Sequence, residues 1–269
     1  MGEILEIILF VFDLLFCMTF KKKDRDASEK NFYRRIRYTH KKGRDIGKNT
    51  KHIKLLINQD TPTYTKSEYY KALCQYKSDL ENAKQSNDRK EIIRCLGKIG
   101  DILKAAGYLN DAIAYYEESL DIHRDIGDRE GEAIDLENIG LVTAEMGDLD
   151  GFLEYFTRAL KIHRDVGNQQ GEAQDLSNMG IITAEMGSEN RALEYLKKAI
   201  KIHRKIEDHQ GEAYDLGNMG IVYREMEDNN TALMYLRQAR DVMEVHNLTH
   251  GKDSVRKKIK RIKKAEKTA

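Results

Sequence analysis

The 269-residue chain has no tryptophan, one proline and three cysteines. So little proline excludes a Pro/Gly-rich disordered chain and favours uninterrupted helices. Cys17, Cys74 and Cys95 are too few and too unevenly spaced for a disulfide framework or a zinc cage, so a reducing compartment is the simpler interpretation. With 34% charged and 40% hydrophobic residues, the composition is typical of a helix-rich soluble protein.

The sequence also lacks the motifs of common enzyme classes. It has no phosphate-binding glycine loop, no HExxH zinc motif, no G-x-S-x-G nucleophile elbow and no CxxC pair. Neighbouring carboxylates such as Glu117 and Glu118 are frequent, but on so highly charged a chain we interpret them as a solvated surface. We therefore expect no enzyme activity, no cofactor and no metal ion.

The net charge of +1 conceals an asymmetry along the chain. Residues 21–66 contain 15 Lys or Arg against 5 Asp or Glu, and residues 252–269 contain 9 against 2. Residues 1–20 contain three acidic residues and no basic ones. The remaining central body is therefore acidic and lies between two basic segments.

A unit of 40 residues recurs within the acidic body. The segment GEAIDLENIGLVTAEM, which begins at Gly131, returns with few changes at Gly171 and Gly211, and a weaker copy lies upstream at 91–107. Such self-similarity is typical of repeat architectures. It predicts four repeats at about 89–128, 129–168, 169–208 and 209–247.

Each repeat is predicted to contain two helices. Leu136 and Ile139 share one face of the first, and Phe156 and Leu160 share one face of the second. Glycine followed by a polar residue predicts a left-handed helix end and an N-cap, as at Gly187–Ser188.

Glycines also lie inside the predicted first helices. Gly180 and Gly220 each cost about 1 kcal/mol relative to alanine there. We expect close packing against small residues, Ala199 and Ala239, to offset this cost.

The pattern resembles the tetratricopeptide repeat family, in a long form of 40 residues. The residues that carry the resemblance are Leu136, Ile139, Gly140, Leu176, Met179, Gly180, Leu216, Met219, Gly220 and Tyr223 in the first helices, and Ala192, Leu196, Ala199, Ala232, Leu236 and Ala239 in the second. The resemblance implies an all-α fold, an α-solenoid of antiparallel helix pairs, and a single capping helix is expected at 66–88. Phe152 stands where the family has a small residue, and Glu227 replaces an inter-helix glycine.

In this family the first helix of each repeat lines a concave groove that receives a peptide, so the resemblance implies a docking surface without a reactive centre. Transferred by register, the groove residues are Asn138, Leu141, Glu145, Asn178, Ile181, Glu185, Asn218, Ile221 and Glu225. Asparagine can donate to and accept from a peptide backbone, the aliphatic row offers apolar contact, and the glutamate row favours a basic or amphipathic partner. Alternatively, the asparagines only bridge adjacent helices.

His123, His163 and His203 occupy one position of successive repeats. Ligands of one zinc ion each lie about 2 Å from it, whereas neighbouring helices pack about 8 to 10 Å apart, so these histidines do not easily converge. We interpret them as structural polar groups near the end of the second helix.

Residues 1–20 are expected to form a hydrophobic N-terminal helix. The apolar run 4–20 would be about 26 Å long, slightly short of a hydrocarbon core of about 30 Å. Because the run also contains acidic residues, three interpretations stay open: a membrane span, an interfacial anchor and a helix docked on protein. If the helix spans a membrane, Lys21–Lys23 would keep the repeats on the cytoplasmic side. The membrane-anchor candidates are Ile4, Phe10, Phe12, Phe16 and Phe20.

The basic segments flank the repeats as a linker at 21–65 and a helix or tail at 248–269. The linker is expected either to contact anionic lipid or to remain a solvated linker. In the tail, Val255, Ile259 and Ile262 have helical spacing, which predicts a cap over the last repeat.

These patterns predict a non-catalytic protein-interaction scaffold in the cytoplasm, held at a membrane by its N-terminal helix. The alternative is a nucleic-acid-binding protein that uses the basic segments 21–54 and 252–267, with the repeats as an oligomerisation platform. Either basic segment could also occupy the acidic groove of its own chain.

Overall fold

The computed structural model describes residues 66–248, 251–252, 255–260 and 262. The expected membrane-anchor helix at 1–20 and the basic linker at 21–65 lie outside the described residues. Where the chain is described, none of its helices is long and apolar enough to cross a bilayer.

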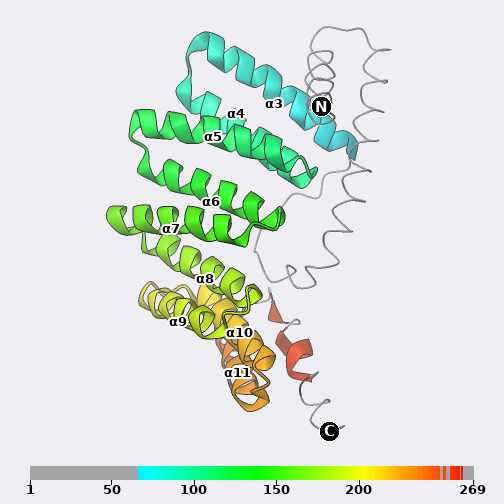
Figure 1. Ribbon diagram of the computed structural model, residues 1–269, viewed down its shortest axis with the longest axis vertical. Coiled ribbons are helices and arrows are strands. Elements are labelled where there is room, and N and C mark those ends of the chain that lie inside the picture. The colour runs from blue at the N-terminus through cyan, green and yellow to red at the C-terminus, as the bar shows by residue number, and fades with distance from the viewer. Residues whose placement is uncertain (1–65, 249–250, 253–254, 261, 263–269) are drawn as a thin grey trace. The chain divides into compact units, whose positions relative to one another are not determined.

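Between residues 66 and 245 the described chain forms nine consecutive helices and no strand (Figure 1). They are α3 (Lys66–Ser86), α4 (Arg89–Ala105), α5 (Leu109–Ile126), α6 (Arg129–Glu145), α7 (Leu149–Val166), α8 (Gln169–Glu185), α9 (Glu189–Lys205), α10 (His209–Glu225) and α11 (Asn229–Val245). The predicted all-α architecture of helix pairs is confirmed, with α4, α6, α8 and α10 as the first helices of the four repeats and α3 ahead of them.

The helices belong to two compact units. In the described chain, the first unit contains α3 to α6 and ends at Met146, and the second begins at Gly147 and contains α7 to α11 and the C-terminal residues. In the second unit α7 packs on α8, α8 on α9, α9 on α10 and α10 on α11, and the first helices α8 and α10 also touch. Sequential neighbours therefore build the core, as expected of a repeat protein.

The turns between repeats follow the predicted chemistry. Gly127 and Gly167 adopt left-handed backbones, with φ of 71° and 76°, at the ends of α5 and α7. Asp128 then caps α6, where its Oδ1 accepts a hydrogen bond of 3.0 Å from the backbone N–H of Gly131. Glu207, between two repeats, and Glu227, between the two helices of the last repeat, adopt the same left-handed conformation without glycine, with φ of 59° and 63°. Each costs about 1 to 2 kcal/mol, so the turn is imposed by the flanking helices.

Two local predictions need correction. Ser188 precedes α9, but its side chain makes no capping hydrogen bond. The glycines inside the first helices do not face Ala199 and Ala239 most closely. A Cβ on Gly180 would lie 2.8 Å from Leu196, and one on Gly220 would lie 2.7 Å from Leu236. Leucine γ-carbons approach most closely, so the glycines make room for a large side chain from the second helix.

Phe152 fits the core of the second unit despite the family's preference for a small residue at its position. It is 1% exposed, and its ring stacks on Phe156 with centroids 4.1 Å apart. Two aromatic rings from successive turns of α7 thus fill the space that one ring and a small residue would otherwise share.

The C-terminal residues join the core of the second unit. Val255, Ile259 and Ile262 are buried in the cluster that also contains Leu236 and Met243 of α11. The predicted apolar side of the C-terminal cap is therefore confirmed, and this stretch completes the last repeat by covering its apolar surface.

Candidate functional site

The predicted groove residues lie on the first helices at spacings of three and four residues, which places them on one face of each helix. On α6, Asn138 and Leu141 are half-buried and Glu145 is exposed. The three side chains form a ladder that runs from a half-buried amide to an exposed carboxylate within the first unit.

The second unit repeats this ladder on two touching helices. On α8 and α10, Ile181 and Ile221 are each 8% exposed, so little apolar surface remains available at this position. Asn178 and Glu185 are half-buried and Glu225 is exposed. Polar groups therefore dominate what α8 and α10 present to a partner.

Asn218 differs from its counterpart Asn178. It is only 4% exposed, and its Oδ1 accepts no hydrogen bond from any described residue. A buried amide oxygen without a donor costs about 1 to 3 kcal/mol. This unsatisfied acceptor sits in the row of asparagines that the sequence assigned to the docking face.

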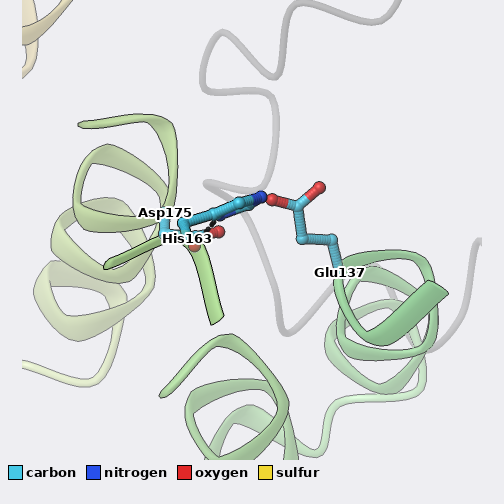
Figure 2. A group of neighbouring side chains, drawn as sticks. All are labelled: Glu137, His163 and Asp175. Carbon is cyan, nitrogen blue, oxygen red and sulfur yellow. Dashed lines mark hydrogen bonds and ion pairs between the residues drawn. The ribbon is translucent and has the colours of Figure 1, made fainter. Parts of the chain in front are cut away.

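A second recurring arrangement joins successive repeats. His123, in the last turn of α5, places Nδ1 2.7 Å from Oδ2 of Asp135 on α6. His163 of α7 makes the same contact with Asp175 of α8 at 2.8 Å, where the ring and the carboxylate lie together (Figure 2). All four side chains are buried. Each pair ties the second helix of one repeat to the first helix of the next.

The third junction has a different ring orientation. His203 places Nδ1 2.9 Å from Oδ2 of Asp208 and Nε2 3.5 Å from Oδ2 of Asp215. Ser177 donates a hydrogen bond of 2.9 Å to the same oxygen of Asp215. Because a hydroxyl from α8 also holds Asp215, α10 is tied to the preceding repeat by two side chains.

Burial shifts the pKa values at this junction. It raises the pKa of Asp215 well above 3.8, although the hydrogen bond from Ser177 opposes the shift. It lowers the pKa of His203 below 6.5, although Asp208 and Glu212 oppose the shift. Burial also raises the pKa of Asp135 at the first junction. The low dielectric thus favours the neutral form of each of these three groups.

At each junction a glycine of the following first helix packs directly against the imidazole. A Cβ on Gly131, Gly171 or Gly211 would lie 2.3 to 2.6 Å from the ring of the junction histidine. An ion pair joins the same two helices at each junction, as between Nε of Arg164 and Oε1 of Glu172 at 2.7 Å. The arrangement is a packed polar contact that fixes repeat spacing, in line with the structural role expected for the histidines.

The sequence predicted the histidine position but not its carboxylate partner. The signal was present, because Asp135, Asp175 and Asp215 each follow a junction histidine by 12 residues. Only the turn geometry shows that this separation brings the two side chains into contact.

Known proteins share this architecture. The tetratricopeptide repeat model matches residues 91–165, 132–205 and 172–244. No curated protein matches the chain. Among solved structures, BtubC (BKLC) from P. vanneervenii is 16% identical with a TM-score of 0.58, over 75% of this chain and 93% of that one.

Two further structures are similar in fold. The nearly identical TPR-like repeats of a putative kinesin light chain from Podosopora anserina are 12% identical with a TM-score of 0.56, over 80% of this chain and 98% of that one. A Rap protein complexed with Competence and Sporulation Factor is 16% identical with a TM-score of 0.52, over 74% of this chain and 60% of that one. The overlapping matches of the family model cover more than half of the sequence, and the chain belongs to the tetratricopeptide repeat family.

Proposed function

We propose that the chain is a non-catalytic scaffold that binds a protein or peptide partner through the polar side chains on one face of each of its first helices. Family membership supports a protein-binding role. The observation that carries the proposal is the register of α8 and α10, which touch and carry an amide, an aliphatic and a carboxylate side chain at equivalent positions. A Rap protein that is similar in fold is complexed with Competence and Sporulation Factor, which supports a ligand-binding role.

The chemistry of the face indicates a basic or amphipathic partner. Glu225 and the half-buried Glu185 would pair with Lys or Arg side chains of the partner. Asn178 and Asn218 would bond to its backbone, and the unsatisfied Oδ1 of Asn218 would gain a donor after a small rotation of its side chain. On α6, Asn138, Leu141 and Glu145 offer the same groups, and we include them among the candidates.

A peptide selection tests this proposal. The full chain is used to recover binders from a display library of random twelve-residue peptides. We expect a pool rich in Lys and Arg whose affinity falls at least tenfold for the double variant Glu185→Lys, Glu225→Lys. The matched control reverses Glu154 and Glu194, which are exposed on the second helices α7 and α9. Equal loss in both variants, or no basic pool, would contradict the proposal.

We further propose that residues 1–20 hold the repeats at the cytoplasmic face of a membrane. The support is the apolar run 4–20, with Ile4, Phe10, Phe12, Phe16 and Phe20 as contacts, followed by Lys21–Lys23. Cell fractionation of the full chain and of a version lacking residues 1–20 tests it. We expect only the full chain in the membrane fraction, and the same distribution for both would contradict a tether.

Nucleic-acid binding is the second candidate function, favoured by the basic composition of residues 21–54 and 252–267. Phosphate neutralisation predicts an affinity for RNA or duplex DNA that falls steeply with salt. A salt titration that shows no measurable binding at low salt would remove this candidate.

Occupation of the acidic face by the chain's own basic linker also remains a proposal. The C-terminal tail is a poor segment to delete for this test, because Val255, Ile259 and Ile262 belong to the core. Deletion of residues 1–65 avoids the problem. We expect the basic peptide pool to bind the shortened chain more tightly, and an unchanged affinity would end the idea.

A further inference from the structure

A hollow of about 440 Å³ opens in the second unit between the C-terminal half of α9, the N-terminal half of α8 and the end of α7. Leu176 and Ile202 provide its apolar lining. Its basic side consists of Arg164, Lys198, Lys201 and Lys205. The volume lies within the range of about 300 to 1,000 Å³ that is typical of ligand pockets.

Among the residues that the structure describes, only one of the four basic side chains of the hollow has a carboxylate partner. Arg164 pairs with Glu172, which is also part of the lining. In the described chain, no carboxylate lies within ion-pair distance of Lys198, Lys201 or Lys205. Three ammonium groups on one side of α9 therefore share one hollow, an arrangement in which they repel one another.

The repeat register shows that this charge is not a property of the fold. Lys198, Lys201 and Lys205 of α9 correspond to Glu118, Asp121 and Asp125 of α5, 80 residues earlier. In α7 the equivalents are Arg158, Lys161 and Asp165, and in α11 they are Gln238, Asp241 and Val245. Only α9 carries three basic residues at these positions, so stacking of the repeats does not require them.

We propose that this hollow is a second docking site, which takes an acidic peptide segment of a partner protein. Carboxylates of the segment pair with Lys198, Lys201 and Lys205, and one of its apolar side chains rests on the half-buried Ile202. The site differs from the first-helix face in position and charge, because that face carries glutamates and favours a basic partner. A chain with both sites would link an acidic partner to a basic one.

The lining favours a peptide over a nucleic acid. No aromatic side chain lines the hollow, so it has no platform on which bases could stack. A phosphate would also make no use of the apolar part of the lining, whereas a peptide can place an apolar side chain there. An acidic segment with an apolar residue matches both parts of the surface.

The same peptide library tests the site with the full chain. We expect a second selected pool, rich in Asp and Glu, whose affinity falls at least tenfold for the triple variant Lys198→Glu, Lys201→Glu, Lys205→Glu. The matched control, Arg191→Glu, Lys197→Glu, Arg237→Glu, makes the same change of charge at exposed positions outside the hollow. Far-UV circular dichroism checks that both variants retain their helices.

The outcomes separate the two docking proposals. Loss of the acidic pool in the triple variant, with the basic pool retained, supports the second site. The proposal is wrong if no acidic pool is recovered, or if both variants bind that pool equally. Displacement of the acidic peptides from the intact chain by single-stranded RNA, with the RNA binding also lost in the triple variant, would assign the hollow to nucleic acid instead.

Discussion

The junctions between repeats change little along the chain, whereas the exposed charges of the second helices change strongly. His163 meets Asp175 as His123 meets Asp135, so two junctions use the same pair of buried groups. On the surfaces, Lys197, Lys198, Lys201 and Lys205 of α9 stand where α5 has Glu117, Glu118, Asp121 and Asp125. The junction histidine contacts a carboxylate in all three repeats, whereas each of these four exposed charges has the opposite sign in α5 and in α9.

The difference follows from where each group lies. A buried ionisable group without its partner is strongly destabilising, and this accounts for a histidine next to a carboxylate at each of the three junctions. An exposed charge contributes about 0 to 1 kcal/mol per pair, and the surface can therefore change sign without loss of the fold. We therefore expect the choice of partner to depend on the exposed charges, and the stability of the fold to depend on the buried junctions.

Breaking a junction should have the largest effect. His163→Ala leaves the carboxylate of Asp175, which is 0% exposed, without its imidazole. We expect the free energy of unfolding of the second unit to fall by about 3 to 5 kcal/mol, measured by urea titration.

A double variant distinguishes the pair from simple loss of packing. His163→Leu with Asp175→Leu removes both polar groups and retains apolar volume. It should recover most of the lost stability, because apolar residues often replace a buried ion pair at little cost. A double variant as unstable as His163→Ala would show that the charge left behind is not the cause.

Adding a side chain beside a junction histidine should have the next largest effect on stability. A Cβ on Gly211 would lie 2.3 Å from Cε1 of His203, whereas one on Gly217, in the same helix, would meet nothing within 4 Å. We expect Gly211→Ala to destabilise by about 1 to 3 kcal/mol through overpacking. Gly217→Ala should stabilise by about 0.5 to 1 kcal/mol, since alanine is the better helix former. Thermal unfolding checks both, and equal shifts would contradict the steric argument.

The third junction should make stability depend on pH. Because burial lowers the pKa of His203 below 6.5, the unfolded chain takes up its proton first as the pH falls. The free energy of unfolding should then decrease below about pH 6.5, by at most about 1.4 kcal/mol per pH unit for one proton.

A comparison with His203→Gln isolates this contribution. The raised pKa of Asp215 acts in the opposite sense, since stability falls as the pH rises from 3.8 through the folded value. Asp208, Asp215 and Glu212 remain in both proteins, so the difference between their pH slopes reports mainly on the imidazole. Parallel slopes below about pH 6.5 would rule out a titrating His203.

The sequence predicted the parts of the fold that depend on local chemistry. Gly127 and Gly167 mark left-handed turns because few other residues adopt positive φ without strain, and the spacing of Val255 and Ile259 identified the apolar side of the C-terminal cap. The period of 40 residues predicted the succession of helix pairs that α4 to α11 form.

Features that depend on the relative placement of helices escaped prediction. Leu196 packs over Gly180 and Ser177 reaches Asp215 only because of how neighbouring helices stack. The hollow beside α9 was missed for the same reason, since a row of lysines on a helix is usually a solvated surface until its neighbours define a cavity. The docking role of Asn178 and Asn218 was inferred from register and stays a prediction.

Substitutions on the surface of α9 should have the smallest effect on stability and a large effect on binding. Lys201 has Lys197, Lys198, Arg204 and Lys205 as helical neighbours three and four residues away. Lys201→Glu turns repulsion into attraction and should stabilise by about 0.5 to 1 kcal/mol at low salt, less as salt screens the charges. Lys197→Glu should be nearly neutral, because it exchanges the attraction of Glu194 for that of Lys201. If Lys201→Glu raises stability and lowers the affinity for the acidic peptides, the role of the lysine is binding. A loss of stability would show instead that α9 needs this charge for folding.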